Sequence, residues 1–117
     1  ALVNSRWRLI RMGSANAPTE VDLSVNATLR FGESGQVNGH SGCNSFGGEH
    51  RVQGRALHIT NLFSTAMACA EEDRMHLERD YLQALQSASS FQLDGDTLTI
   101  FYDGQAGALV FSRFALE

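Results

Sequence analysis

The feature that most constrains the fold is a series of short segments in which apolar and polar residues alternate, separated by glycine-containing turns. The clearest case spans residues 91–102, where Asp94-Gly95-Asp96 separates two alternating segments. Asp-Gly in such a position is the strongest short-range signal of a β-hairpin. Similar reversals over residues 31–37, 52–55 and 103–107 predict further hairpins, so we expect mostly antiparallel strands.

Residues 71–87 differ from the rest of the chain because they contain no glycine or proline. Their apolar side chains recur at spacings of three and four, at Leu77, Tyr81, Leu82 and Leu85. This spacing predicts one amphipathic helix. We expect its polar face to carry five carboxylates, Glu71, Glu72, Asp73, Glu78 and Asp80.

The whole pattern predicts about five strands, one helix and about three further strands in a single domain spanning residues 1–117. Hairpin-linked strands leave unpaired edges unless their sheet curls or closes. We therefore expect a mainly β fold with one α-helix (α+β), built as a small antiparallel curled sheet or barrel of about eight strands with the helix packed on it. An open sheet with the helix across one face is the alternative.

Several short motifs resemble those of a known family. They are Trp7-x-Leu9, Gly42-Cys43-Asn44, Ser64-Thr65-x-Met67-Ala68-Cys69, Tyr81-Leu82-x-Ala84-Leu85, Gly95-Asp96-x-Leu98-x-Ile100 and Leu109-Val110-Phe111. In order and spacing they resemble the META domain of HslJ-type proteins over nearly the whole chain. One departure is Ala66, where the family often carries arginine.

The resemblance implies a β-barrel-like fold with one helix in an exported bacterial protein, located in the periplasm or at the outer membrane. Members of the family are often lipid-anchored, so the resemblance also implies a lipid anchor upstream of Ala1. The family is associated with heat shock and with resistance to novobiocin. It supplies no catalytic residue set to carry over to this sequence.

The two cysteines, Cys43 and Cys69, bear on the cellular compartment. An even number of cysteines in a small domain is compatible with a disulfide and an oxidising location. We predict a bridge between the glycine-rich loop and the segment before the helix. Free thiols are one alternative, and a cysteine nucleophile or a zinc site is another. By sequence alone the histidines available to such a site are His40, His50, His58 and His76.

Asn44, Ser45 and Phe46 form a candidate binding loop, because binding residues concentrate on loops. The alternative for Asn44 is a structural one, in which its side chain bonds to nearby main chain. The glycines between residues 39 and 48 are not followed by the Gly-Lys-Ser/Thr of a phosphate-binding loop. We expect them to permit a bulge or kink in a curled sheet.

Composition and motifs favour few other chemistries. All 9 basic side chains are arginines spread along the chain, and the formal net charge is -4, so we expect no nucleic-acid partner. The absence of lysine excludes Schiff-base chemistry. Asp94-Gly95-Asp96 lacks the run of oxygen ligands found in an EF-hand. We therefore predict no catalytic residues, no metal site and no cofactor.

The hypothesis that follows is a non-catalytic accessory or interaction domain of the bacterial envelope that contributes to stress tolerance, with an unidentified envelope protein as partner. The alternative is a small barrel that carries a lipid or another small hydrophobic ligand. A cysteine- or metal-dependent enzyme and an inhibitor of an envelope enzyme are two further candidates.

Overall fold

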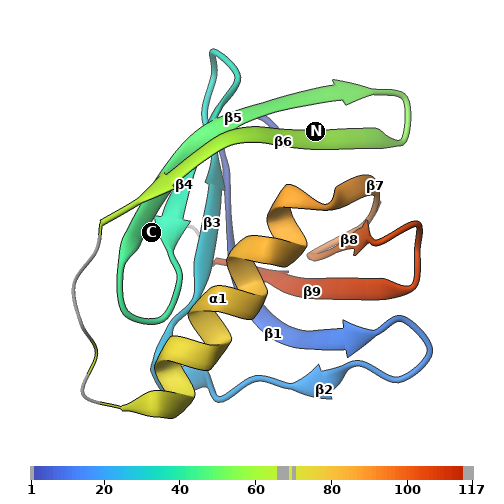
Figure 1. Cartoon of the computed structure of the whole chain (residues 1–117). Coiled ribbons are helices and arrows are strands. Elements are labelled where there is room, and N and C mark those ends of the chain that lie inside the picture. Colours follow the sequence, from blue (N-terminus) through green and yellow to red (C-terminus); the bar gives the residue numbers. More distant parts are fainter. Residues whose placement is uncertain (1, 66–68, 70, 115–117) are drawn as a thin grey trace.

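A computed structural model describes residues 2–65, 69 and 71–114, which form an antiparallel barrel with one α-helix (Figure 1). The strands are β1 (Ser5–Ser14), β2 (Thr19–Glu20), β3 (Thr28–Phe31), β4 (Gln36–His40), β5 (Ser45–Gln53), β6 (Ala56–Ser64), β7 (Ala88–Asp94), β8 (Thr97–Tyr102) and β9 (Gly107–Arg113). A short 3-10 helix, η1 (Leu23–Val25), precedes β3, and the helix α1 (Glu72–Gln86) connects β6 to β7.

The strand order is β2-β1-β3-β4-β5-β6-β7-β8-β9, and an additional pairing of β1 with β9 closes the sheet. Eight strands therefore form the barrel, while β2 is an extra strand attached to β1. The predicted barrel with one packed helix is confirmed, and the open-sheet alternative is wrong. Closure leaves few unpaired strand edges, which suits a domain built almost entirely from hairpins.

Two local predictions about strands and turns have different outcomes. The Asp94-Gly95-Asp96 hairpin is present between β7 and β8, with Gly95 at a φ of 60°, a value that glycine adopts without strain. The predicted number of strands before the helix is one too low, because Thr19 and Glu20 pair with Met12 and Arg11 as an additional short strand. Six strands rather than five therefore precede the helix.

The barrel interior is filled by side chains from alternate positions of the strands. Trp7, Phe31 and Phe111 are fully buried, together with Leu and Ile residues of facing strands. Removing a side chain of this size from water contributes about 1.5–3 kcal/mol. Gly39 on β4 fits only without a side chain, because a Cβ there would overlap the carbonyl oxygen of Thr28 on β3.

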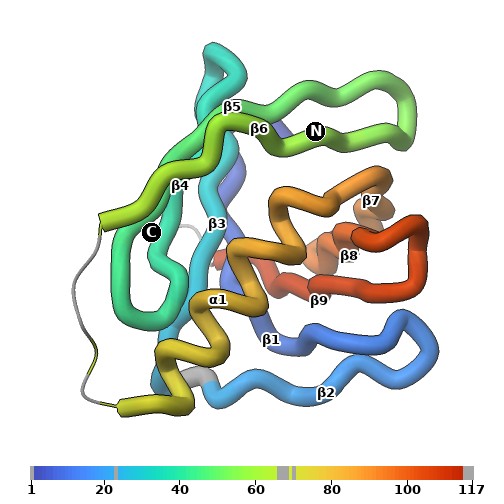
Figure 2. Tube along the Cα trace, viewed as in Figure 1, coloured from blue at the N-terminus to red at the C-terminus, as the bar shows by residue number. Residues whose placement is uncertain are grey.

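The helix α1 crosses the front of the barrel in Figure 2, with the β5–β6 hairpin above it and the β1–β2 hairpin below it. It buries Tyr81, Ala84 and Leu85 against the barrel core. The Tyr81 hydroxyl donates a hydrogen bond to the Thr28 carbonyl oxygen at 2.8 Å, which satisfies a polar group deep in the core. Burial raises the pKa of Tyr81 well above its usual value. Within the described part of the chain, no helix is long and apolar enough to span a membrane.

Two places in the barrel depart from regular strand pairing. The register of β5 and β6 shifts near Asn61, whose φ of 56° marks the extra residue of a bulge. The shift turns Phe63 outward, and its ring lies over Gly47 while remaining 69% exposed. The second place is the β6–β7 seam, where the ladder among the described residues consists of one pair, Ala56 with Ser90.

Candidate functional site

The loop of residues 41–44 between β4 and β5, here called the cysteine loop, is tied to the segment before α1 by the Cys43–Cys69 disulfide. The predicted bridge is present, with the two Cα atoms 5.9 Å apart. It closes a loop with a sequence separation of 26 residues. In the chain-entropy account such a crosslink stabilises the fold by restricting the unfolded chain.

A carboxylate on α1, Glu78, holds the other side of the cysteine loop. Its Oε1 accepts hydrogen bonds from Ser41 Oγ at 2.6 Å, Asn44 N at 2.7 Å and Cys43 N at 3.3 Å. Its Oε2 accepts one from Asn44 Nδ2 at 2.8 Å. The cysteine loop is therefore held twice, by the disulfide to the segment before α1 and by this carboxylate to α1 itself.

Thr65 extends the same hydrogen-bond cluster to the end of β6. Its Oγ1 donates to Asn44 Oδ1 at 2.9 Å and accepts from Ser45 N at 3.2 Å. Its backbone N donates to the Ser45 carbonyl oxygen at 3.0 Å. Both ends of the Asn44 amide are thus engaged within the protein, by the side chains of Glu78 and Thr65, whereas the structural alternative expected nearby main chain as the partner.

The electrostatics of Glu78 follow from this environment. Partial burial raises its pKa, but the hydrogen bonds from Ser41, Asn44 and Cys43 favour the charged form more strongly. The net effect is a lowered pKa, so Glu78 is ionised at neutral pH. The sequence groups Glu78 with four other carboxylates on the polar face of the helix, and the structure shows that its carboxylate is turned to the cysteine loop. Sequence offered no signal that distinguished it from the other helix carboxylates.

The predicted binding loop is less accessible than its composition suggests. Asn44 is 3% exposed and Phe46 is 4% exposed, and Phe46 packs edge-on against Tyr81 at 5.8 Å between ring centroids. The side chain of Ser45 alone among the three is exposed. A recognition role for these residues stays a prediction, and in this structure it would depend on Ser45.

Of the four histidines, His40 lines a surface hollow together with Cys43 and Cys69, but the cysteines are not available for thiol or zinc chemistry. Both cysteines are in the disulfide, so neither is a thiolate in this structure. His40 Nδ1 accepts a hydrogen bond from Gly42 N at 3.3 Å, and His50 packs edge-on against Phe31 at 4.9 Å. Among the described residues, no group of three or more histidines, cysteines and carboxylates is arranged to hold a metal ion.

A groove of about 930 Å³ lies between α1 and the segment that runs from the end of β1 through β2 to η1; we call it the helix groove. Its apolar lining includes Met12, Val21, Val25 and Leu77. Six carboxylates line it as well: Glu20, Asp22, Glu71, Asp73, Asp80 and Asp103. Arg74 is the one cation among the described lining residues, and it is 3.6 Å from the Glu71 carboxylate. The groove is therefore strongly acidic.

The pKa shifts of two groove residues agree with a negatively charged groove. Hydrogen bonds from the backbone and side chain of Ser24 lower the pKa of Asp22, so this carboxylate is charged at neutral pH. Burial raises the pKa of Tyr102, and the nearby charges of Asp103 and Asp80 raise it further. Sequence reasoning missed the groove because its carboxylates come from the β1–β2 hairpin, α1 and the β8–β9 turn, which meet only in the folded chain.

The sequence pattern of the META domain matches residues 1–114. The chain belongs to the META domain family. The family that the sequence motifs indicated is therefore confirmed.

Solved structures share the fold of this META domain. An NMR structure of a protein from Burkholderia xenovorans has a TM-score of 0.80 and 24% identity, covering 98% of this chain and 85% of that one. A crystal structure of a DUF4847 family protein from Bacteroides vulgatus has a TM-score of 0.75 and 14% identity, covering 99% of this chain and 96% of that one. At these identities the likeness shows the fold alone. No curated protein matches the sequence.

Proposed function

We propose that this META domain is a non-catalytic accessory domain of the bacterial cell envelope that binds a positively charged segment of another envelope protein in the helix groove. The observation that carries the proposal is the set of six carboxylates against one arginine around a groove of about 930 Å³. A surface hollow lined by one sign of charge raises the local concentration of an oppositely charged partner. The apolar lining of the groove supplies contacts for the aliphatic stems of lysine and arginine.

The packing of the barrel favours this function over a carrier that holds a ligand inside. Trp7, Phe31, Tyr81 and Phe111 occupy the interior and are fully buried. Eight-stranded barrels of this kind have an interior just wide enough for side chains or for one small ligand. Side chains take that space here, so an external groove is the better place for a partner.

The envelope location belongs to the same proposal. The Cys43–Cys69 disulfide suits an oxidising compartment, and membership of the META domain family supports export. Fractionation of cells that express the protein from its native gene, followed by immunoblotting, tests the location. Recovery in the cytoplasm with reduced cysteines would contradict it.

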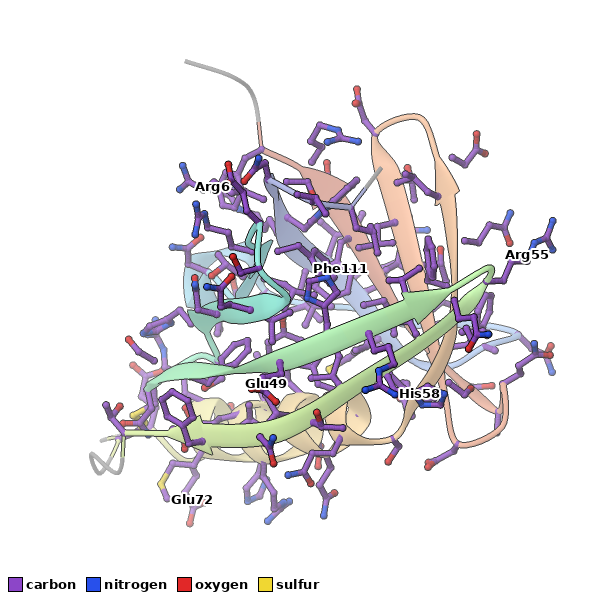
Figure 3. All side chains as sticks on the ribbon, turned by 90° about the horizontal axis from the view of Figure 1, so that it is seen from above. Arg6, Glu49, Arg55, His58, Glu72 and Phe111 are labelled. Carbon is purple, nitrogen blue, oxygen red and sulfur yellow. A yellow bond between two sulfur atoms is a disulfide. The ribbon has the colours of Figure 1, made fainter. Side chains whose placement is uncertain are left out.

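Binding in the groove is tested by an NMR titration of the ¹⁵N-labelled domain with a lysine- and arginine-rich test peptide. We expect amide shifts at groove residues such as Val21 and Leu77, and a loss of affinity of about tenfold in a D73N/D80N variant. The matched control is E49Q/D94N, which removes the same number of charges from residues that do not line the groove; Glu49 lies on β5 in Figure 3. Equal weakening in both variants, or shifts outside the groove, would contradict the site.

The proposed contribution to stress tolerance has a separate test. Cells lacking the protein are supplied with the wild type, D73N/D80N or E49Q/D94N, and survival is measured after heat and after novobiocin treatment. We expect the wild type and the control to restore survival, and D73N/D80N to fail. Full rescue by D73N/D80N would separate the groove from the stress role.

A further inference from the structure

The fold gathers arginines that the sequence spreads along the chain. Arg6 on β1 and Arg30 on β3 are directly opposite each other in the β1–β3 ladder. Arg8 lies two residues further along β1, on the same outward face, since Trp7 between them is fully buried in the core. These three residues form a surface that we call the arginine patch.

An aromatic ring holds part of this patch in place. Arg6 and Arg8 both lie against Phe114, with their Cζ atoms 5.2 and 5.0 Å from its ring centroid. The Phe114 N donates a hydrogen bond to the Arg6 carbonyl oxygen at 3.0 Å, which fixes the position of the ring on β1. Cation–π contact orients a guanidinium without neutralising its charge.

The charges of the patch are not balanced within the described chain. The arginines that form ion pairs among the described residues are Arg74, Arg79 and Arg113, and Arg113 pairs with Asp96 at 3.3 Å. Among the described residues, the three patch arginines form none. Within the same part of the chain, the buried Nε of Arg8 has no hydrogen-bond partner. Like charges directly opposite each other in a ladder are destabilising, so the fold tolerates a cost here.

A shallow hollow next to these arginines has the size and lining for a small anion. It measures about 210 Å³ and is lined by Arg6, Arg30, Asn38, Gly39 and Phe114 among others. Gly39 contributes to this lining without a side chain, for which the approach of Thr28 leaves no room. None of its lining residues lines the helix groove.

We propose that the arginine patch binds a phosphate group, held chiefly by Arg6 and Arg30. A guanidinium presents parallel N–H donors that match the oxygens of a phosphate. A phosphate monoester carries close to two negative charges at neutral pH, so it balances clustered arginines better than a single carboxylate. The group can be free phosphate or the headgroup of an anionic lipid, which present the same chemistry.

The test titrates the ¹⁵N-labelled protein with inorganic phosphate at constant ionic strength, with chloride as the competing anion. We expect shifts at Asn38, Gly39 and Phe114, and at least a tenfold weaker Kd in an R6Q/R30Q variant. The matched control is R51Q/R55Q, which removes two exposed arginines from the β5–β6 hairpin, at whose tip Arg55 appears in Figure 3. Melting temperatures check that each variant is folded.

A second arm distinguishes the two sources of the group. Cosedimentation compares vesicles of phosphatidylcholine with vesicles that also contain phosphatidic acid. Binding that requires phosphatidic acid and is lost in R6Q/R30Q identifies a lipid headgroup, whereas binding of inorganic phosphate alone identifies a soluble ligand. The proposal is overturned if neither probe binds, or if R6Q/R30Q and R51Q/R55Q bind equally well.

Discussion

The cysteine loop and the arginine patch differ in whether their charged groups have partners among the described residues. At the loop, one carboxylate, Glu78, receives hydrogen bonds from four donors, and a disulfide closes the same connection. At the patch, Arg6 and Arg30 are placed side by side with no ion pair among the described residues. The first arrangement satisfies its polar groups internally and therefore serves the fold. The second leaves its charges to solvent or to another molecule.

Among the changes that test this contrast, loss of the disulfide should lower the free energy of unfolding the most. A C43S/C69S variant should lose about 3.5 kcal/mol of unfolding free energy, since the crosslink has a sequence separation of 26 residues. Urea denaturation of the variant and of the oxidised wild type measures the difference, and reduced wild type is the control. An unchanged midpoint would mean that Glu78 alone is sufficient to hold the loop.

A somewhat smaller effect is expected at the carboxylate. E78Q should destabilise the domain by about 2 kcal/mol, because charge-assisted hydrogen bonds are lost and the new amide N–H meets the Asn44 amide donor. E72Q at an exposed position of the same helix is the control. A similar loss in both variants would show that the effect belongs to the helix and not to the loop.

The pH dependence of stability provides a second test of the contribution of Glu78. The folded-state pKa of Glu78 is below its usual value of 4.5, so its contribution is complete above that value and is lost as the pH falls toward the folded pKa. Unfolding free energies of the wild type should therefore decline on acidification below about pH 4.5 more steeply than those of E78Q. Parallel curves for the two proteins would remove Glu78 from the acid response.

The smallest effect is expected at the patch, and it has the opposite sign. Replacing Arg30 by glutamine removes one of two opposed like charges, so stability should stay the same or rise by up to about 0.5 kcal/mol, most clearly at low salt. Thermal melts at two salt concentrations provide the measurement. Destabilisation by R30Q would indicate that the patch serves the fold in the same way as the cysteine loop.

Sequence reasoning succeeded where the determinant is local. Turn residues such as Gly95 predicted hairpins, and the spacing of Tyr81 and Leu85 predicted a helix over residues 71–87 that the structure places at Glu72–Gln86. The barrel followed from the need to pair strand edges. Hydrogen-bonding and packing within the protein then explain why Asn44 and Phe46 are buried in spite of their place after a glycine-rich loop.

Sequence reasoning failed where segments distant in the chain meet. The bulge at Asn61 reverses the alternation of β6, so Phe63 faces outward where a regular strand would turn it inward. Opposition of Arg6 and Arg30 depends on the β1–β3 register, which no single segment encodes. The partner of Glu78 depends on how α1 lies across the barrel, and the same is true of the helix groove.

Because the β6–β7 seam has so short a ladder, backbone pairing between neighbouring strands varies around the barrel. Ala56 with Ser90 is its ladder pair among the described residues, supported by a hydrogen bond from Phe91 N to the Arg55 carbonyl oxygen at 3.0 Å. The helix α1 links these same two strands and buries Tyr81 and Leu85 in the core, so side-chain packing rather than a long ladder keeps them together. Opening fluctuations of the native state should begin there, and slow amide exchange should be concentrated in the long ladders that β9 forms with β1 and β8.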